Sequence, residues 1–333
     1  MTEQNNSKSS EESGATQQKT LLEEIKVPAP PPLPPEAPVS DDTDAPKTAH
    51  YLPRIVAFVD ILGFKDIVYR SRGDVNLFNS IYGALDIRND EMAVAYAAEL
   101  GIGRSATDFD DKFHTFSDCI VMSVSDDIEE LGLLLYVVFH TCRRLLKAGF
   151  LSRGGIACGD LLHHAPDRTK PDQLEQSPMV FGPAFIDAYN LESAHADGAR
   201  VILQNKVRQM IEDYCEDPML PNPRLKLFFD AHIDRAPDGP SFVNLFADFP
   251  GNAFYKPDLD VTADIELIHS KLCEALKHTS DKPHHFKKNA MLAEEFNRAL
   301  ETATQVPRHK HLTSHIIPAR ILPSRHSRRS TDR

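Results

Sequence analysis

The spacing of apolar and polar residues predicts where strands and helices form in the middle of the chain. Residues 54–59, "RIVAFV", are a short apolar run that predicts a buried strand ending on Asp60. Residues 75–85, "VNLFNSIYGAL", repeat apolar positions every four residues, which is typical of one helical face. We therefore expect helical structure from Phe64 to about Leu100.

Two further patterns follow. Residues 112–124, "KFHTFSDCIVMSV", predict two strands joined by a tight turn at Ser117-Asp118. Residues 126–149 start with acids and end with Arg, Lys and Gly, the charge order that a helix dipole favours. The remaining segments predict a strand with a glycine kink and a hairpin return (150–164), a helix entered at Gly182-Pro183 (179–196), a strand (200–204), a helix (205–214), two late strands (225–234 and 241–249) and two amphipathic helices (262–278 and 286–303).

This order predicts an α+β fold. A β-α-β-β-α-β plan is that of the ferredoxin-like sheet, with helices on one face. The later elements form a C-terminal extension of strands and helices. We assign residues 51–304 to this domain with its extension, residues 1–50 to a disordered proline-rich tail, and residues 305–333 to a disordered basic tail.

Composition separates the ends from the middle. Residues 27–38, "VPAPPPLPPEAP", hold seven prolines in twelve positions and cannot bury enough apolar area to order. The formal net charge is −12; residues 1–50 contribute −5 and residues 303–333 contribute +6, which leaves −13 for the part between. The basic end could touch nucleic acid or anionic lipid, but a solvated tail is the simpler interpretation. The negative charge of this middle part argues against binding to nucleic acid. A phosphorylated ligand bound there would need cations to neutralise its charge.

Cysteine usage and the hydrophobic pattern give the only indications of the cellular compartment. The five cysteines are scattered without a C-x-x-C pair, the usage of a reduced compartment without disulfides or structural zinc. We find no signal-peptide pattern and no apolar stretch of about 18 residues, so we predict no membrane span and a cytoplasmic location.

The candidate chemistry begins with two carboxylates, Asp60 and Asp118. In a β-α-β-β plan the first strand and the later hairpin are neighbours, so the two side chains meet at one sheet edge. Two anions so placed repel unless a divalent cation lies between them, and Mg²⁺ or Mn²⁺ accepts such ligands together with phosphate. The alternative is structural, with Asp60 a helix cap and Asp118 a turn residue.

The residues after Asp60 suit a phosphate. Gly63 allows close backbone approach. The N–H groups of Leu62, Gly63 and Phe64, at the start of a helix, would form an anion site.

Four motifs carry a family resemblance. "FVDILGF", "TFSDCIV", "SRGGIACGDL" and "VFGPAFIDAYNLES" occur in the order and approximate spacing of the class III nucleotide cyclase catalytic domain, over about residues 54–200. The chain resembles that family, which implies that Asp60 and Asp118 bind metal and that the carbonyl of Ile61 joins them. The family's two ions, Mn²⁺ or Mg²⁺, clamp the triphosphate and activate the attacking oxygen.

The chain departs from the family pattern at polar positions. Ile186 stands where the family has a ribose-orienting Asn, and Asn190 where it has a transition-state Arg. His114 occupies a base-selecting position four residues before Asp118. Met179 replaces the Asp with which adenylyl cyclases read adenine. A site without these polar groups is poorly matched to adenine.

The chain is most similar to the bacterial pyrimidine cyclases of the Pycsar anti-phage systems. "FVDILGFK", "SRGGIACG", "FGPAFIDAYNLE" and "KKNAMLAEEFN" carry this resemblance over most of residues 51–304. It implies conversion of UTP, or CTP, to the 3′,5′-cyclic monophosphate, a homodimer with sites at its interface, and a separate effector that senses the product. The alternatives are a purine cyclase with an atypical pocket and an inactive cyclase-like module that binds nucleotides or dimerises.

Three further assignments complete the expected site. Arg153 is the candidate for the cation that replaces the family Arg, with Lys65 and Lys112 as others; a salt bridge is its alternative role. Phe58 should share a strand face with Asp60 and could stack on a base, or it could be a core residue. With Asp60, Asp118 and Arg153 catalytic, we expect Phe58, Leu62, Gly63, Phe64 and His114 to bind the nucleotide.

Overall fold

The computed structural model describes residues 50–85, 90–103, 112–164, 177–196, 198–236, 239–318 and 321–322. The chain divides into two units, residues 1–48 and 49–333, and all described residues belong to the second. The predicted proline-rich tail, residues 1–50, therefore lies outside the described residues except for His50.

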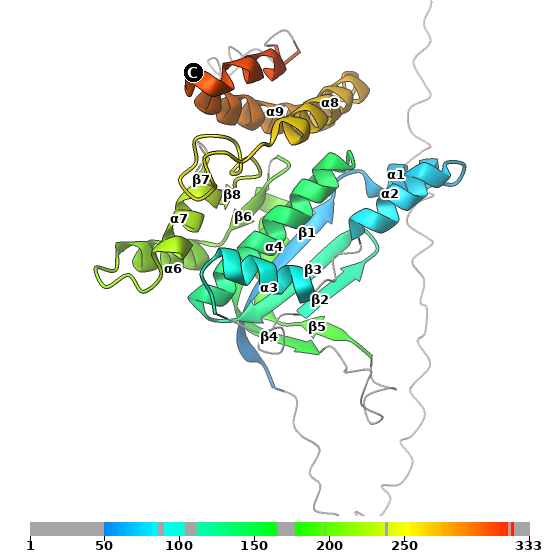
Figure 1. Cartoon of the computed structure of the whole chain (residues 1–333). Helices are drawn as coiled ribbons and strands as arrows, with labels where there is room; N and C mark the ends of the chain where they lie inside the picture. The colour runs from blue at the N-terminus through cyan, green and yellow to red at the C-terminus, as the bar shows by residue number, and fades with distance from the viewer. Residues whose placement is uncertain are drawn as a thin grey trace, which may run out of the picture. The chain divides into compact units, whose positions relative to one another are not determined.

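Four antiparallel strands form the centre of the sheet (Figure 1). They are β1 (Leu52–Ile61), β2 (Lys112–Phe116), β3 (Cys119–Ser125) and β4 (Ser152–His164). Their order is β2-β3-β1-β4, with helices between β1 and β2 and between β3 and β4. This is the strand order of the ferredoxin-like βαββαβ plan, so the predicted α+β fold is confirmed.

Short strands extend the sheet beyond β4. β6 (Val201–Leu203) runs parallel to β4, and β8 (Ser241–Val243) and β7 (Ile233–Arg235) continue it antiparallel. β5 (Met179–Phe181) pairs with the end of β4. The predicted hairpin return within residues 150–164 is wrong, because β4 is one continuous strand as far as His164 and its partner comes later in the chain.

Helices cover both faces of the sheet, and the prediction of one covered face is wrong. Ile55, Ala57 and Val59 of β1 belong to the main core with α4 (Ile128–Lys147). Val56 and Phe58 belong to a smaller cluster with α5 (Pro183–Asn190). Because the β1 residues between Ile55 and Val59 are buried on both sides, the strand needs a partner layer on each.

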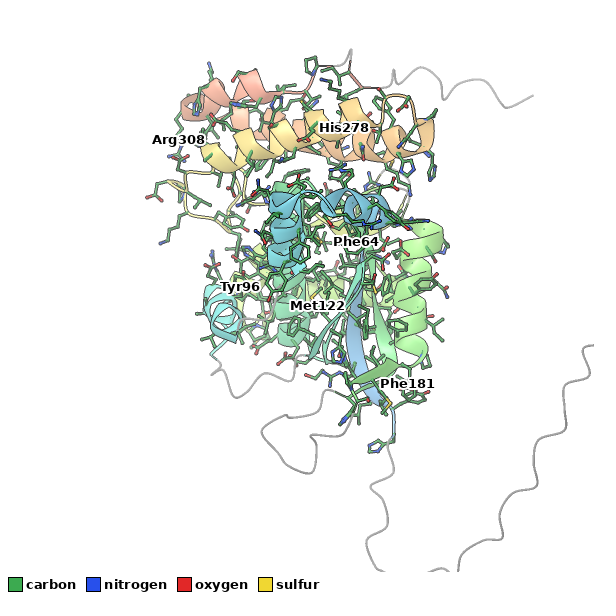
Figure 2. All side chains as sticks on the ribbon, turned by 90° about the vertical axis from the view of Figure 1, so that its right-hand side faces the viewer. Phe64, Tyr96, Met122, Phe181, His278 and Arg308 are labelled. Carbon is green, nitrogen blue, oxygen red and sulfur yellow. The ribbon has the colours of Figure 1, made fainter. Side chains whose placement is uncertain are left out.

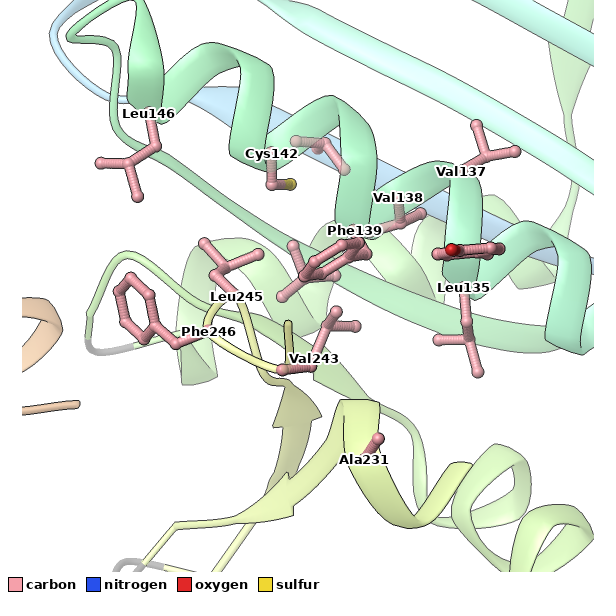
Figure 3. Close-up of a cluster of buried hydrophobic side chains, with 14 of the residues drawn as sticks. Leu135, Val137, Val138, Phe139, Cys142, Leu146, Ala231, Val243, Leu245 and Phe246 are labelled. Atoms are coloured by element: carbon pink, nitrogen blue, oxygen red, sulfur yellow. The ribbon is translucent and has the colours of Figure 1, made fainter. Parts of the chain in front are cut away.

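The helix α4 is the largest element of the core. Asp127 caps it by accepting hydrogen bonds from the N–H groups of Glu129 and Glu130, and Arg144 and Lys147 lie in its last turn. Figure 3 shows Phe139 and Cys142 of α4 pointing toward Val243 and Leu245, which belong to the same core. The predicted long buried helix is confirmed.

The described residues between Phe64 and Leu100 are mostly helical, as predicted. It contains α1 (Phe64–Ser71), α2 (Val75–Leu85) and α3 (Asp90–Glu99). Further along, α6 (Asn205–Glu216) is also as predicted.

One late strand prediction is wrong. Residues 225–234 belong mostly to α7 (Pro223–His232), and only Ile233 and Asp234 of the predicted strand lie in β7. Asn222 caps this helix by accepting from the N–H groups of Arg224 and Leu225. The buried residues Leu225, Phe228 and Phe229 have helical spacing, and the cap with its following Pro223 decides for the helix.

Two amphipathic helices, α8 (Thr262–His278) and α9 (Pro283–Thr304), form near their predicted positions. The predicted disordered tail from residue 305 is wrong for its first part, because η4 (Pro307–His315) is a 3₁₀ helix with Leu312 buried. Asn297 of α9 fixes the chain after it, since its side chain donates to the carbonyl of Ile317 and accepts from the Ile317 N–H. Among the described residues, no helix is long and apolar enough to span a membrane.

A buried ion pair joins α4 to the C-terminal region. The Arg143 side chain is 5% exposed, and it donates to Asp248 at 2.7 Å and to the Leu245 carbonyl at 3.1 Å. Burial raises the pKa of Asp248, and the charge of Arg143 opposes the rise. The neighbouring pair of Lys147 and Asp264 is more than a third exposed.

Breaking the buried pair should lower the free energy of unfolding more than breaking the exposed pair. Arg143→Met keeps much of the side-chain volume but leaves Asp248 buried without its cation, so we expect the free energy of unfolding to fall by about 3 kcal/mol. Lys147→Ala removes an exposed pair and should cost less than about 1 kcal/mol. Urea denaturation of both variants measures the difference, and equal losses would contradict it.

Candidate functional site

The structure brings the two predicted carboxylates together at the end of β1. Asp60 is the partner of Cys119 in the β1–β3 pairing, and Asp118 precedes Cys119 in the hairpin turn. The Ile61 N–H donates to the Asp118 carbonyl oxygen at 2.9 Å, which fixes the turn against β1. The predicted juxtaposition of Asp60 and Asp118 is confirmed.

Asp60 is not a helix cap. The cap position of α1 belongs to Gly63. The Asp60 side chain is 22% exposed, whereas Asp118 is exposed at the tip of the hairpin. Burial raises the pKa of Asp60, Arg153 lowers it, and the charge of Asp118 raises it further, with a net rise. Because each anion disfavours the other, the pair favours a cation between them.

The donor set suits a hard divalent cation shared with a ligand. Within the described ranges, no group of three or more His, Cys, Asp or Glu side chains is arranged to hold a metal ion. Two carboxylates with phosphate and water are sufficient for Mg²⁺ or Mn²⁺. The nearby Cys119 is an unsuitable ligand, because burial first and then the charge of Asp118 raise its pKa to about 11. Whether the Ile61 carbonyl joins the set stays a prediction.

Arg153 is held between two carboxylates. It is the partner of Asp60 in the β1–β4 pairing, and its Nε lies 3.6 Å from the Asp60 Oδ2. It also forms an ion pair with Glu192, which is buried in the π-helical turn η3 (Leu191–His195) after α5. The structure therefore places Arg153 in a salt bridge, the alternative role, and its assignment as the cation for the leaving group stays a prediction. Lys65 is exposed, and the side chain of Lys112 lies outside the described residues.

Glu192 is the site residue that our sequence interpretation missed. Burial raises its pKa, Arg153 lowers it, and the charge of Asp60 raises it. The available signal was its position: Ala184, Ala188 and Glu192 follow one another at intervals of four along the face of α5 and η3 that is buried. A carboxylate at the end of such a row needs a partner, and Arg153 supplies it.

The close packing of α5 on β4 depends on glycine. A Cβ atom on Gly155 would lie 2.3 Å from the carbonyl oxygen of Ala188 and 2.6 Å from the Cβ of Leu191. A Cβ on Gly154 would lie 2.3 Å from the Phe58 carbonyl oxygen. Gly155 thus lets α5 and η3 approach β4 closely enough for Glu192 to reach Arg153, whereas Gly154 lies against the backbone of β1.

The loop after Asp60 only partly matches the predicted anion site. Gly63 has φ 73°, a left-handed conformation that favours glycine, and a Cβ there would meet nothing within 4 Å. In the described part of the chain, the N–H groups of Gly63 and Phe64 have no backbone acceptor. The Leu62 N–H donates to the Leu151 carbonyl at 2.8 Å, so Leu62 is wrong as a donor. The Phe64 side chain packs against the main core (Figure 2).

Phe58 and His114 are both buried in this structure. Phe58 is 7% exposed, and its ring meets Phe185 and Tyr189 of α5 edge to face, which favours its alternative role as a core residue. His114 lies beside His163, with 3.2 Å between its Nδ1 and the Nε2 of His163. Nucleotide binding by these two residues stays a prediction.

The buried polar chain around His114 is a structural feature. His163 Nδ1 lies 2.6 Å from the Ser123 hydroxyl, and Arg54 Nε donates to that hydroxyl at 3.1 Å. These bonds join β1, β3 and β4 on the α5 face of the sheet.

Comparisons with known proteins add little. No protein-family model matches the chain, and no curated protein matches it. Among solved structures, the chain is similar to a bacterial light-regulated adenylyl cyclase, with TM-score 0.35 and 12% sequence identity. The match covers 66% of this chain and 57% of that one, so the chain spans less than two thirds of that neighbour. A TM-score this low carries no argument, and the fold is established by the strand order and pairing.

The glycine contact predicts a test of the site's architecture. Gly155→Ala forces α5 away from β4, so we expect the free energy of unfolding to fall by about 2 kcal/mol or more. The matched control is Gly83→Ala in α2, where a Cβ meets nothing within 4 Å. There we expect a gain of up to about 1 kcal/mol from helix propensity. Chemical denaturation measures the free energy of unfolding of both variants. An unchanged free energy in Gly155→Ala would contradict the packing argument.

Proposed function

We propose that this chain is a nucleotide cyclase that acts on a pyrimidine nucleoside triphosphate. The observation that carries the proposal is the convergence of Asp60 and Asp118 at one sheet edge, fixed by the bond from the Ile61 N–H to the Asp118 carbonyl. The order of the sequence motifs around these residues supports the same reaction class. UTP is favoured over CTP.

The residues at the edge would hold Mn²⁺ or Mg²⁺ in the presence of the nucleotide. When bound, two such ions lower the pKa of the ribose 3′-hydroxyl and offset the phosphate charge. Asp60, whose pKa the site raises, gains most from a nearby cation. Arg153 keeps the Asp60 side chain oriented from the opposite strand, and Glu192 keeps Arg153 in place.

The reaction is an intramolecular displacement. The 3′-oxygen forms a bond to the α-phosphorus, the bond from that phosphorus to the bridging oxygen breaks, and diphosphate leaves. The proton of the 3′-hydroxyl passes to solvent. Positioning and electrostatics supply most of the rate in such reactions, so the two carboxylates carry the catalysis.

The surface of α5 supports a pyrimidine base over a purine. Ile186 and Asn190, at the positions of the family's polar residues, are exposed on this helix, and the nearby Met179 is exposed too. Met179, at the position of the Asp with which adenylyl cyclases read adenine, offers no hydrogen-bond donor and only a weak acceptor to a purine edge.

The same surface supports a homodimer with sites at its interface. Phe116, Met179, Phe181, Ile186 and Tyr189 are large apolar residues, and all are more than 40% exposed. Phe116 lies on β2 beside the turn that carries Asp118, Ile186 and Tyr189 lie on α5, and Met179 and Phe181 lie on β5, which pairs with the far end of β4. Apolar surface of this kind is typical of a protein contact. In this proposal the product signals to a separate effector in anti-phage defence.

The specific alternative is a catalytically inactive module. The observation in its favour is the ion pair between Arg153 and Asp60, which partly neutralises a predicted metal ligand. The retained Asp118 and the raised pKa of Asp60 weigh against it.

The test is product formation from an equimolar mixture of ATP, GTP, CTP and UTP with Mn²⁺. We expect cyclic UMP as the main product, detected by mass spectrometry. Asp60→Asn and Asp118→Asn should each lower kcat/KM by about 100-fold or more, because each removes a carboxylate that would hold the metal ions against the reacting phosphate.

Asp230→Asn is the matched control, since Asp230 is exposed on α7 and pairs only with Lys226 among its described contacts. It should leave activity unchanged. Cyclic AMP or cyclic GMP as the main product would overturn the pyrimidine assignment. No product from any nucleotide, with the protein folded by circular dichroism, would favour the inactive module.

A further inference from the structure

A cavity of about 750 Å³ adjoins the loop after Asp60. One wall comes from Leu62 and Gly63 and from α1 and α2, and the other from α8, from Lys282 and from the start of α9. Figures 1 and 2 both show α8 and α9 beyond the end of β1 where α1 begins. The cavity thus joins the ferredoxin-like sheet to the C-terminal extension.

Cations from the extension gather at this cavity. Lys271, Lys282 and Lys288 line it with His278 and His285, and Arg70 lines it from α1. The chain as a whole carries −12, so this is a local excess.

The acids in the cavity are largely engaged. They are Asp66, Asp74 and Glu274. Asp74 accepts a hydrogen bond from the Leu77 N–H at the start of α2. Glu274 lies 3.4 Å from Lys271 and 3.6 Å from His278.

Lys288 connects the cavity to the carboxylate site. It lines the cavity wall on α9, and Leu62 and Gly63, which follow Asp60 by two and three residues, line the same cavity. Gly63, which also lines the cavity, has an exposed backbone and an N–H without a backbone acceptor in the described part of the chain. A chain of phosphates that starts at Asp60 and Asp118 would therefore meet Gly63 first and the lysines next.

We propose that this cavity receives the diphosphate end of the nucleoside triphosphate, and that Lys282 and Lys288 of the C-terminal extension bind it. The inference rests on the proposed function for the identity of the ligand. Negative charge grows on the diphosphate as it leaves, and fixed cations beside it stabilise that charge. The extension would thereby add cations to Arg153, which contacts Asp60 and Glu192.

Inorganic tripolyphosphate is the probe, because it carries the phosphate chain without base or ribose. We expect the intact chain to bind it with Mn²⁺ present, measured by isothermal titration calorimetry. The double variant Lys282→Ala, Lys288→Ala should weaken binding by about tenfold or more. Lys288→Arg should retain most of the affinity, since it keeps the charge.

Lys226→Ala is the control, because Lys226 lies on α7 and pairs with Asp230 away from the cavity. It should change the affinity by less than about twofold. A second control is uridine monophosphate, whose affinity the double variant should leave unchanged because it lacks the diphosphate end. Circular dichroism checks that each variant is folded.

The outcomes separate this inference from the proposed function. Cyclic nucleotide formation with unchanged tripolyphosphate affinity and unchanged kcat/KM in the folded double variant overturns the role of the cavity and leaves the cyclase standing. Lysine-dependent tripolyphosphate binding without cyclic product from any nucleotide supports the phosphate site and overturns the cyclase. A double variant that weakens tripolyphosphate and uridine monophosphate equally would also overturn the assignment of the cavity to the diphosphate end.

Discussion

Two carboxylates contact one guanidinium at the end of β1, a third carboxylate lies beside them, and this imbalance of charge constrains everything around it. Arg153 contacts Asp60 and Glu192, while Asp118 acts on Asp60 from the hairpin. Burial raises the pKa of Asp60 and of Glu192, and Arg153 lowers both. Cys119, beside the same charges, is kept as a thiol. A site with surplus negative charge binds an anionic phosphate only if additional cations arrive, and it therefore requires either metal ions or side chains from elsewhere in the chain.

The two faces of the sheet that carries these charges are covered by apolar layers of unequal size. The α4 side of the sheet is a large core, whereas the α5 side is a small cluster centred on Val56, Phe58 and Ala188. The thin layer works because Gly155 lets the backbone of α5 lie against β4. It ends at η3, where the first charged pair appears. The site is thus located where the apolar cover of the sheet ends.

Local patterns allowed much of this to be predicted from the sequence. The strand that ends on Asp60, the hairpin that carries Asp118 and the long helix α4 each have a periodicity or charge order within one segment, and each was predicted. The segment at 225–234 was misassigned because short apolar runs fit either a strand or a helix, and the deciding cap at Asn222 lies outside the run. The position of Phe58 on the face of Asp60 followed from strand parity, but its burial depended on Phe185 and Tyr189 of a later helix. The ion pair of Arg153 was not predicted for the same reason, since its partner Glu192 comes from η3. The periodicity within one segment does not predict how that segment packs against a distant one.

The bond from the Ile61 N–H to the Asp118 carbonyl has a consequence for how such a site can diversify. The separation of the two carboxylates is set by main-chain atoms, and these are the same whatever side chains surround them. The surface of α5 and the walls of the neighbouring cavity can then exchange residues without disturbing the pair. Residues that recognise a different base or phosphate arrangement can then change while the main-chain bond keeps the backbones of the two aspartates in place.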